Sequence, residues 1–505
     1  MDRETYEEYL GNLVETMLHD MDNSSSANVM MIKHYNALDI TQSDIDNIAG
    51  ERKDVRFLYH SYETGDIVTA FEPFLDWVKD GCYELYGDDV EAFFDAADIY
   101  LLHRPVYKSY FETGICRRKE SILVNEIDFE TEKFQNEMVS MVKLLAKDRP
   151  LVMVLNKIQF AGSSTIKLLN RLMEESVAGN IFILLTYNEM FGEKEYFKDD
   201  WRQLISALDS SDSIIEWAFS PVKELHENKG HFEFAYEKVT EYIDKLTNLY
   251  EMLALDQADY YLNIIYRKIE VEDVDISMEH RFKFLEIYAY VTLSLDKMSD
   301  ALLYCNNMRF ILEENNDYEM DYTYNYLKAQ ISMYSTQKDN ADVYVQRCKK
   351  LCEQINNPFL TFKTKLLALM NEFSGWRNLW LLTEDKYVEP EIIDECIRYE
   401  HYNHLAHIYV YAFDNDPSKY VSVYPSDFDT HCTITNAAKR IASDEYFDRT
   451  QPYGKWKDTG LRLEGEAVRS LTSIFLELWH IQDWTKEPEG DYLNIRHSVP
   501  AEGFV

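Results

Sequence analysis

Three histidines lie three residues apart in the segment EHYNHLAHIY, and histidines at such spacing can bind a metal ion. On a helix, His404 and His407 would share one face, and His401 precedes them. No carboxylate follows at ligand spacing, and the surrounding Tyr and Leu residues are typical of helix packing. We therefore expect no metal here. The chain also lacks GxSxG, HExxH and paired CxxC motifs, so we expect no catalytic residues.

Phosphate chemistry would need a glycine-rich loop after the first strand. In a P-loop, GxxxxGK[ST], backbone N–H groups wrap the phosphates, the Lys reaches the β and γ groups, and Ser or Thr binds the metal. The segment in register here is HYNALDIT, residues 34–41, in which only Thr41 matches. Asp39 stands at a glycine position and would repel phosphate, and Ile40 replaces the lysine. We expect no bound nucleotide or other cofactor.

The segments around this loop predict a parallel sheet. β-rich runs at 29–32, 55–59, 151–155 and 181–187 alternate with helical stretches, which is the pattern of a sheet covered on both faces. The third and fourth runs are almost wholly apolar, as expected of central strands.

The order of these segments resembles the signal-transduction ATPases with numerous domains (STAND), a branch of the AAA+ superfamily. The resemblance covers about residues 20–222. Its landmarks are AFEPFLDW at 70–77, the Walker B-like segment LVMVLNKIQFAG at 151–162 and IEWAFSP at 215–221. It implies a P-loop-ATPase-like sheet flanked by helices. An unrelated α/β domain with a similar strand pattern is the alternative.

The catalytic residues of that family are absent. Asn156 and Lys157 stand where two carboxylates would hold magnesium, and a cation there cannot attract the metal. The fourth run ends in Thr186-Tyr187-Asn188, where relatives place Thr-Tyr-Arg. The chain therefore resembles a degenerate ATPase. The positions expected to form its vestigial pocket are Asp39, Ile40, Thr41, Asn156, Lys157 and Thr186.

From about residue 235 the β-rich runs disappear, and a helical pattern repeats with a period of 40 residues. Aligning 286–304 with 326–344 pairs Ala289 with Ala329 and Ala301 with Ala341. Small residues twelve apart suit an antiparallel helix pair whose backbones approach closely. The pattern resembles the tetratricopeptide repeat (TPR), lengthened from its usual 34 residues, and an irregular helical bundle is the alternative.

We therefore predict a multidomain α/β plus α fold. An ATPase-like domain spans 1–222, a TPR-like solenoid spans 223–375, and a further helical region with a frayed tail spans 376–505. The first helices of the repeats would build a concave face rich in tyrosine, which suits protein or peptide binding. The alternative is that these tyrosines fill the seams between helices. The residues expected on that face are Glu286, Tyr290, Tyr326 and Gln330.

The charge composition disfavours some classes of binding partner. With 51 basic and 90 acidic residues the net charge is −39, which disfavours binding to nucleic acid or anionic membranes. The densest basic run, 117–119, is expected to be a solvated turn. Seven scattered cysteines are typical of reduced core thiols, and the N-terminus lacks a secretion signal, so we expect a cytoplasmic protein.

These features predict a non-catalytic regulatory or scaffold protein, similar to the sensory half of bacterial signalling proteins. In relatives such a half regulates a cyclase, a diguanylate cyclase or a transcription activator, and no such output domain occurs in this chain. Three alternatives remain open. The first is a nucleotide-binding switch or slow ATPase, and the second is the sensory part of a diguanylate cyclase or transcription regulator whose output domain is absent. The third is an enzyme within 376–505.

Overall fold

The computed structural model divides the chain into two units, 1–442 and 443–505. The residues that it describes all lie in the first unit. They span 3–408 except 21–27, 35–39, 51, 64, 122–126, 175–179, 189–196, 212, 218–231, 233, 271–275, 315–316, 336–337, 375–389, 403 and 406–407. The domain boundaries expected after 222 and 375, and the helices expected beyond 408, lie outside the described residues.

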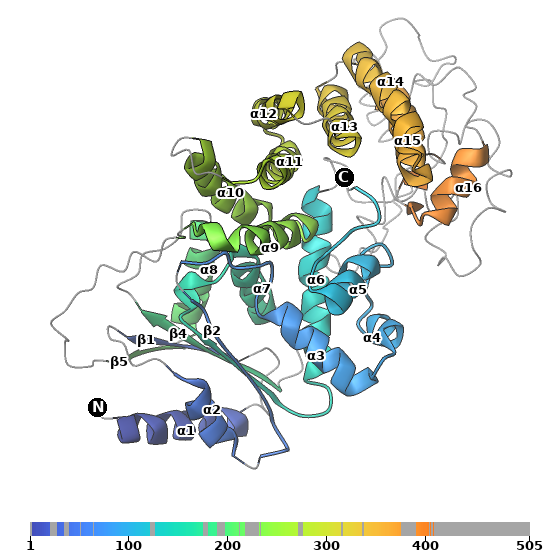
Figure 1. The fold of residues 1–505 in the computed structure, drawn as a ribbon. Coiled ribbons are helices and arrows are strands. Elements are labelled where there is room, and N and C mark those ends of the chain that lie inside the picture. Colours follow the sequence, from blue (N-terminus) through green and yellow to red (C-terminus); the bar gives the residue numbers. More distant parts are fainter. Residues whose placement is uncertain are drawn as a thin grey trace, which may run out of the picture. The chain divides into compact units, whose positions relative to one another are not determined.

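Five parallel strands form one sheet in the order β2-β3-β4-β1-β5 (Figure 1). The parallel sheet and the four strands expected from the sequence are confirmed. The strands are β1 Asn28–His34, β2 Arg56–Ser61, β3 Leu151–Asn156, β4 Ile181–Asn188 and β5 Ile214–Trp217.

The central strands are buried on both faces because their side chains alternate between two apolar clusters. Val152 and Val154 of β3 pack with Leu10 of α1 (Arg3–Asp20) and Ile45 of α2 (Gln42–Ala49). Met153 points into the larger cluster on the opposite face. Between β2 and β3 lie α3 Phe74–Tyr86, α4 Val90–Ala96, α5 Arg104–Thr113 and α6 Ile127–Leu145. Between β3 and β5 lie the short helix η3 Ile158–Phe160, α7 Ser163–Glu174 and α8 Lys198–Ser210.

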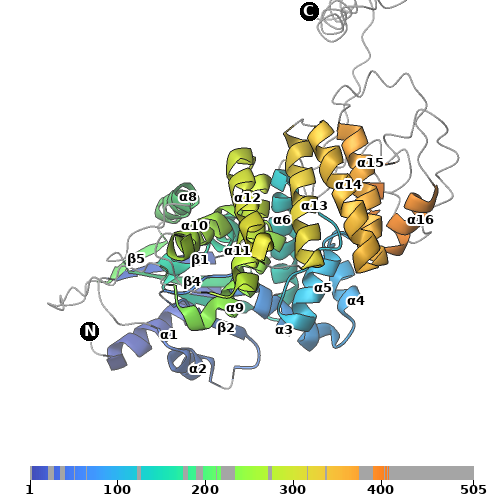
Figure 2. The ribbon, with the colours of Figure 1, turned by 45° about the horizontal axis from the view of Figure 1, so that its top comes forward.

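The second half of the described chain is helical, as predicted, and each helix from α9 to α16 contacts the next one along the chain (Figure 2). After the short η5 (Tyr236–Lys238) come α9 Val239–Glu251, α10 Leu255–Glu270, α11 Met278–Ser294, α12 Met298–Glu314, α13 Tyr318–Tyr334, α14 Lys338–Ile355, α15 Pro358–Ser374 and α16 Pro390–Arg398. Helices α11, α13 and α15 begin 40 residues apart.

The alanines paired in the sequence alignment lie at equivalent places in these helices. Ala289, Ala301, Ala329 and Ala341 lie on α11, α12, α13 and α14, and each is fully buried. A methyl side chain lets the two helices of a hairpin approach closely where a larger residue would hold them apart. The 40-residue period therefore corresponds to one helical hairpin.

One apolar core continues from the sheet into the hairpins. It includes Met153 of β3, Leu262 of α10 and Ile331 of α13. Polar contacts reinforce the junction, because Gln257 Nε2 donates to the Val68 carbonyl at 2.6 Å. The α/β and helical regions therefore share a single packed interior.

Two further expectations concern bulk properties. The cysteines within the described residues are buried and unpaired, as predicted, and Cys432 lies outside them. Within the same residues no helix combines the length and apolarity that crossing a bilayer requires.

Candidate functional site

Polar side chains at the carboxyl ends of β2, β3 and β4 hydrogen-bond to one another across the sheet edge. Asn156 Nδ2 donates to Ser61 Oγ at 3.0 Å, and Thr186 Oγ1 donates to Asn156 Oδ1 at 2.5 Å. Thr186 Oγ1 also accepts the backbone N–H of Lys157 at 2.9 Å. Asn156 and Thr186 are 1% and 2% exposed. We call this hydrogen-bonded chain of Ser61, Asn156, the Lys157 backbone N–H and Thr186 the edge ladder.

The strand register creates the edge ladder. Ser61 is paired with Asn156 in the β2–β3 register, and β3 is the neighbour of β4. Lys157 leaves the strand with a φ of 61°, in the left-handed region that residues other than glycine seldom adopt. The hydrogen bond from its amide to Thr186 holds that turn in place.

The N-terminus of α2 carries its own anion. The N–H and the Oγ1 hydroxyl of Thr41 both donate to Asp44 Oδ2 at 2.7 Å, and the Asp44 N–H donates to Thr41 Oγ1 at 3.3 Å. Asp44 is 2% exposed, and the preceding Ile40 is fully buried. This capping box places a carboxylate at the positive end of the helix, where a P-loop would hold phosphate.

Open α/β sheets bind ligands beyond the carboxyl ends of their strands. Of the six positions expected to form a vestigial pocket, the structure brings Asn156, Lys157 and Thr186 into one hydrogen-bonded chain. Ile40 and Thr41 precede α2, and Asp39 lies outside the described residues. Within the edge ladder, the hydrogen-bonding groups bond to one another, and the same holds within the capping box.

The four residues expected to bind a partner lie on two successive first helices. Glu286 and Tyr290 are on α11, and Tyr326 and Gln330 are on α13. The Tyr290 ring lies 5.7 Å from that of Tyr250 on α9. Tyr326 and Gln330 are each 8% exposed, whereas Tyr290 is half-buried.

Charged groups accompany these tyrosines. Lys363 Nζ of α15 lies 4.6 Å from the centre of the Tyr326 ring. Burial lowers the pKa of Lys363, while Glu286 and Glu251 oppose that change. Burial also raises the pKa of Tyr250 to about 12. We call this set on α9, α11, α13 and α15 the tyrosine face: Tyr250, Glu286, Tyr290, Tyr326, Gln330 and Lys363.

A buried histidine bridges two glutamates of α6. His103 Nδ1 lies 2.8 Å from Glu137 Oε2, and its Nε2 lies 2.6 Å from Glu130 Oε2. The imidazole is 2% exposed and stacks on Phe134 with the ring centres 3.8 Å apart. Burial alone would lower the pKa of His103, but Glu137 and Glu130 raise it above its usual value. The protonated imidazolium is therefore favoured.

The basic run at 117–119 is not a wholly solvated turn, and that prediction is wrong for Arg118. The Arg118 side chain is 8% exposed, and its Nε donates to Glu251 Oε2 at 2.7 Å. Its guanidinium also lies 4.7 Å from the Tyr250 ring. A carboxylate 133 positions away makes this burial possible, and the local sequence gives no sign of it.

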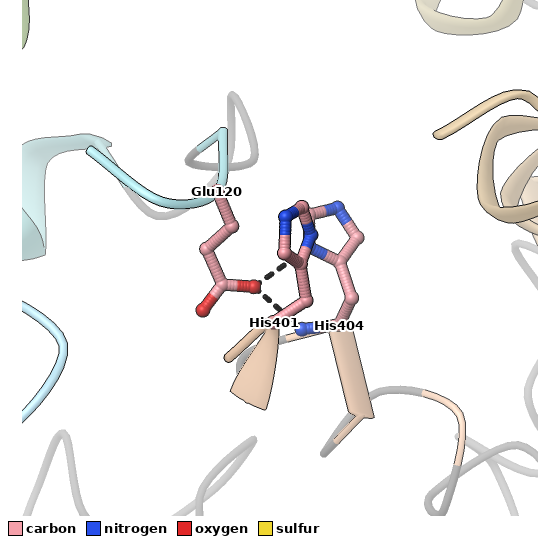
Figure 3. Close-up of side chains that lie close together, drawn as sticks. All are labelled: Glu120, His401 and His404. Atoms are coloured by element: carbon pink, nitrogen blue, oxygen red, sulfur yellow. Dashed lines mark hydrogen bonds and ion pairs between the residues drawn. The ribbon is translucent and has the colours of Figure 1, made fainter. Parts of the chain in front are cut away.

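Next to this run, Glu120 meets two of the three spaced histidines (Figure 3). Glu120 Oε2 accepts hydrogen bonds from the His404 backbone N–H at 3.0 Å and from His404 Nδ1 at 2.7 Å. One ligand atom from each of Glu120, His401 and His404 lies within 4.8 Å of the others. Burial lowers the pKa of His401 to about 4, so its ring is neutral at pH 7. His407 lies outside the described residues.

Glu120 also lines a cleft of about 790 Å³. The cleft is bordered by His103 and Lys108 at α5, Glu130 at α6, and Tyr402 beyond α16. It therefore lies between the buried histidine bridge and the histidine pair.

Comparison with known proteins finds short partial matches. No family model matches the chain, and no solved structure does either. An uncharacterized protein of Streptococcus mutans is 36% identical over 63 residues, which cover 12% of this chain and 14% of that protein. A cardiolipin synthase of Alkalihalophilus pseudofirmus is 51% identical over 39 residues, 8% of each chain. One of Geobacillus kaustophilus is 41% identical over 51 residues, 10% of each chain. The chain thus spans a small fraction of each relative's length.

Two charged clusters escaped the sequence analysis. Glu130 and Glu137 lie seven residues apart on α6, a spacing that places both carboxylates on one helix face and could have been noticed. Their partner His103 could not have been noticed, because it precedes α6 by more than twenty residues. Glu120 carries no local signal, since its contact with His404 spans 284 positions.

Proposed function

We propose that this protein is a non-catalytic regulatory scaffold, in which an ATPase-like sheet supports an array of helical hairpins that binds a protein or peptide partner. The observation that carries the proposal is the closed carboxyl edge of the sheet. A nucleotide would need free phosphate donors and a metal-binding carboxylate at that edge.

The carboxyl edge of the sheet instead holds polar groups that already form hydrogen bonds with one another. Asn156 and Thr186 use their polar atoms within the edge ladder, and Asp44 fills the N-terminus of α2. Opening the edge ladder for a nucleotide would leave buried amide and hydroxyl groups without partners, which costs about 1 to 3 kcal/mol for each group. The arrangement therefore favours a platform over a switch or slow ATPase.

The tyrosine face supports the binding half of the proposal. Tyrosine supplies large contact area at low cost in conformational entropy, and the charged Glu286 beside it can orient a polar partner. Glu286 is 16% exposed at its side chain and accepts from Lys283 Nζ at 2.9 Å, and Tyr290 is half-buried, so a partner would meet Glu286 together with Lys283. A net charge of −39 favours a partner with a basic surface. As in the sequence analysis, we place the protein in the cytoplasm.

The short matches to cardiolipin synthases do not lead us to propose that activity. Each covers a tenth or less of the enzyme. We therefore expect the purified protein to synthesise no cardiolipin, and formation of that lipid would contradict the scaffold proposal.

Site-specific photocrosslinking tests the partner face. A photoreactive phenylalanine analogue is placed at Tyr290, and a matched variant carries it at Phe310 of α12, which is aromatic, 67% exposed and outside the tyrosine face. In cells of the source organism we expect a discrete protein adduct from position 290 and none from 310. Adducts of equal yield from both positions, or from neither, would contradict the proposed face.

A further inference from the structure

The geometry points to a metal site that the sequence alone argued against: we infer that Glu120, His401 and His404 bind one divalent transition-metal ion of the zinc class. Two imidazoles and one carboxylate are a known ligand set for zinc, with a fourth position left for water or another ligand. This inference is independent of the scaffold proposal, because it does not involve the edge ladder or the tyrosine face.

The ligand atoms are already gathered. Those of Glu120, His401 and His404 lie within 4.8 Å of one another. Tetrahedral coordination at about 2.0 Å places ligand atoms about 3.3 Å apart. The remaining closure, at most about 1.5 Å, is within the reach of side-chain rotation in glutamate, which has three rotatable bonds.

An unpartnered buried imidazole supplies a second, independent observation. His401 is 3% exposed, and neither of its ring nitrogens makes a well-formed hydrogen bond within the described part of the chain. The Lys119 backbone exerts only the smallest of the effects on the pKa of this ring. Buried polar atoms are nearly always satisfied, so such a ring calls for a ligand. Figure 3 shows the His401 ring beside that of His404, on the same side of the Glu120 carboxylate.

Both sides of the site are held in place by neighbouring structure. On one side, the Cys116 N–H donates to Asn248 Oδ1 at 2.7 Å, and Arg118 is paired with Glu251, so the segment leading to Glu120 is fixed on α9. On the other side, the His401 ring packs edge-on against Phe362 of α15 at 5.0 Å. Side chains whose surroundings are fixed in this way meet the requirement for a pre-organised site.

Binding would replace a shared proton by the cation. A proton now joins His404 Nδ1 to Glu120 Oε2, and the metal ion would take its place. A neutral His404 would then carry that proton on Nε2, whereas an imidazolium would release one proton to solvent. The ion would then connect the segment after α5 to the residues after α16. The adjoining cleft gives it a route from solvent to Glu120.

Metal titration of the full chain tests the inference. The protein is stripped with a chelator and titrated with Co²⁺, whose visible absorption reports a low-symmetry nitrogen and oxygen site, and then with Zn²⁺ by calorimetry. We expect one equivalent to bind. Glu120→Gln and His401→Ala should each weaken binding by at least about 10- to 100-fold, the loss seen even for residues that only support a ligand.

Two controls locate the site. His280→Ala removes a histidine on α11 that is remote from the cluster, and His407→Ala removes the third histidine of the spaced segment. Both should bind Co²⁺ as the wild type does. Circular dichroism of the metal-free Glu120→Gln protein should match the wild type, which separates lost ligation from lost folding. Absence of a stoichiometric Co²⁺ site, or loss of that site only in His407→Ala, would overturn the assignment to Glu120, His401 and His404.

Discussion

Replacing His103 by Gln is expected to lower the free energy of unfolding by about 3 to 5 kcal/mol, the usual cost of breaking a buried ion pair by removing one partner. His103 is 2% exposed and contacts Glu130 and Glu137, whose side chains are 7% and 6% exposed. Glutamine can donate to one carboxylate but cannot neutralise either. Glu137 would keep its bonds from Tyr107 Oη at 3.0 Å and from the Tyr100 N–H at 2.9 Å, and Glu130 would keep Lys133 Nζ at 3.9 Å, but neither contact replaces the shared imidazolium.

The pH dependence follows from the direction of the His103 pKa. Because the two glutamates raise that pKa in the folded protein, the stabilisation is fully present below the unfolded value of about 6.5. It is lost as the pH rises through the raised, folded value. The difference between wild type and His103→Gln should therefore be largest near pH 6 and should shrink at alkaline pH.

Urea denaturation followed by circular dichroism measures this difference. His280→Gln serves as the matched control, because His280 is partly exposed and its ring Nε2 lies 3.5 Å from Thr240 Oγ1. We expect that control to lie within about 0.5 kcal/mol of the wild type. A loss below about 1 kcal/mol in His103→Gln, or a difference that grows with pH, would refute the reasoning.

Three further substitutions test the packing of the fold. Thr186→Val should cost about 1 to 3 kcal/mol in urea denaturation, because it removes the hydroxyl that bonds the Lys157 amide and Asn156 Oδ1. Gly162→Ala should lower the melting temperature in calorimetry, since a Cβ there would come within 2.3 Å of the Gln257 amide and break its bond to Val68. Ala329→Leu should overpack the hairpins by about 1 to 3 kcal/mol and reduce hydrogen-exchange protection in α13. Wild-type behaviour in any of these assays would contradict the contact concerned.

Much of the fold could be predicted because its signals are local. The apolar runs that became β3 and β4 alternate between two buried faces, so no polar residue interrupts them. The repeat was visible through Ala289 and Ala329, since a close helix approach excludes larger side chains at both positions.

One local signal was missed: Thr41 and Asp44 form a capping box three residues apart, and a P-loop alignment that ends at Thr41 does not reach Asp44. The rest depends on contacts between distant segments. Arg118 is buried only because Glu251 approaches it, and Glu120 meets His404 only in the folded chain. A single sequence contains no periodicity that links such residues.

The central claim is that the carboxyl edge of the sheet is closed to nucleotides. Isothermal titration calorimetry of the full chain against ATP and ADP with magnesium, up to millimolar ligand and paired with thermal denaturation, tests it most directly. We predict no binding heat and no change in melting temperature. Micromolar binding would contradict the claim and make the nucleotide-binding switch the correct description. Such a nucleotide, at a concentration 100 times its dissociation constant, would stabilise the fold by about 2.7 kcal/mol.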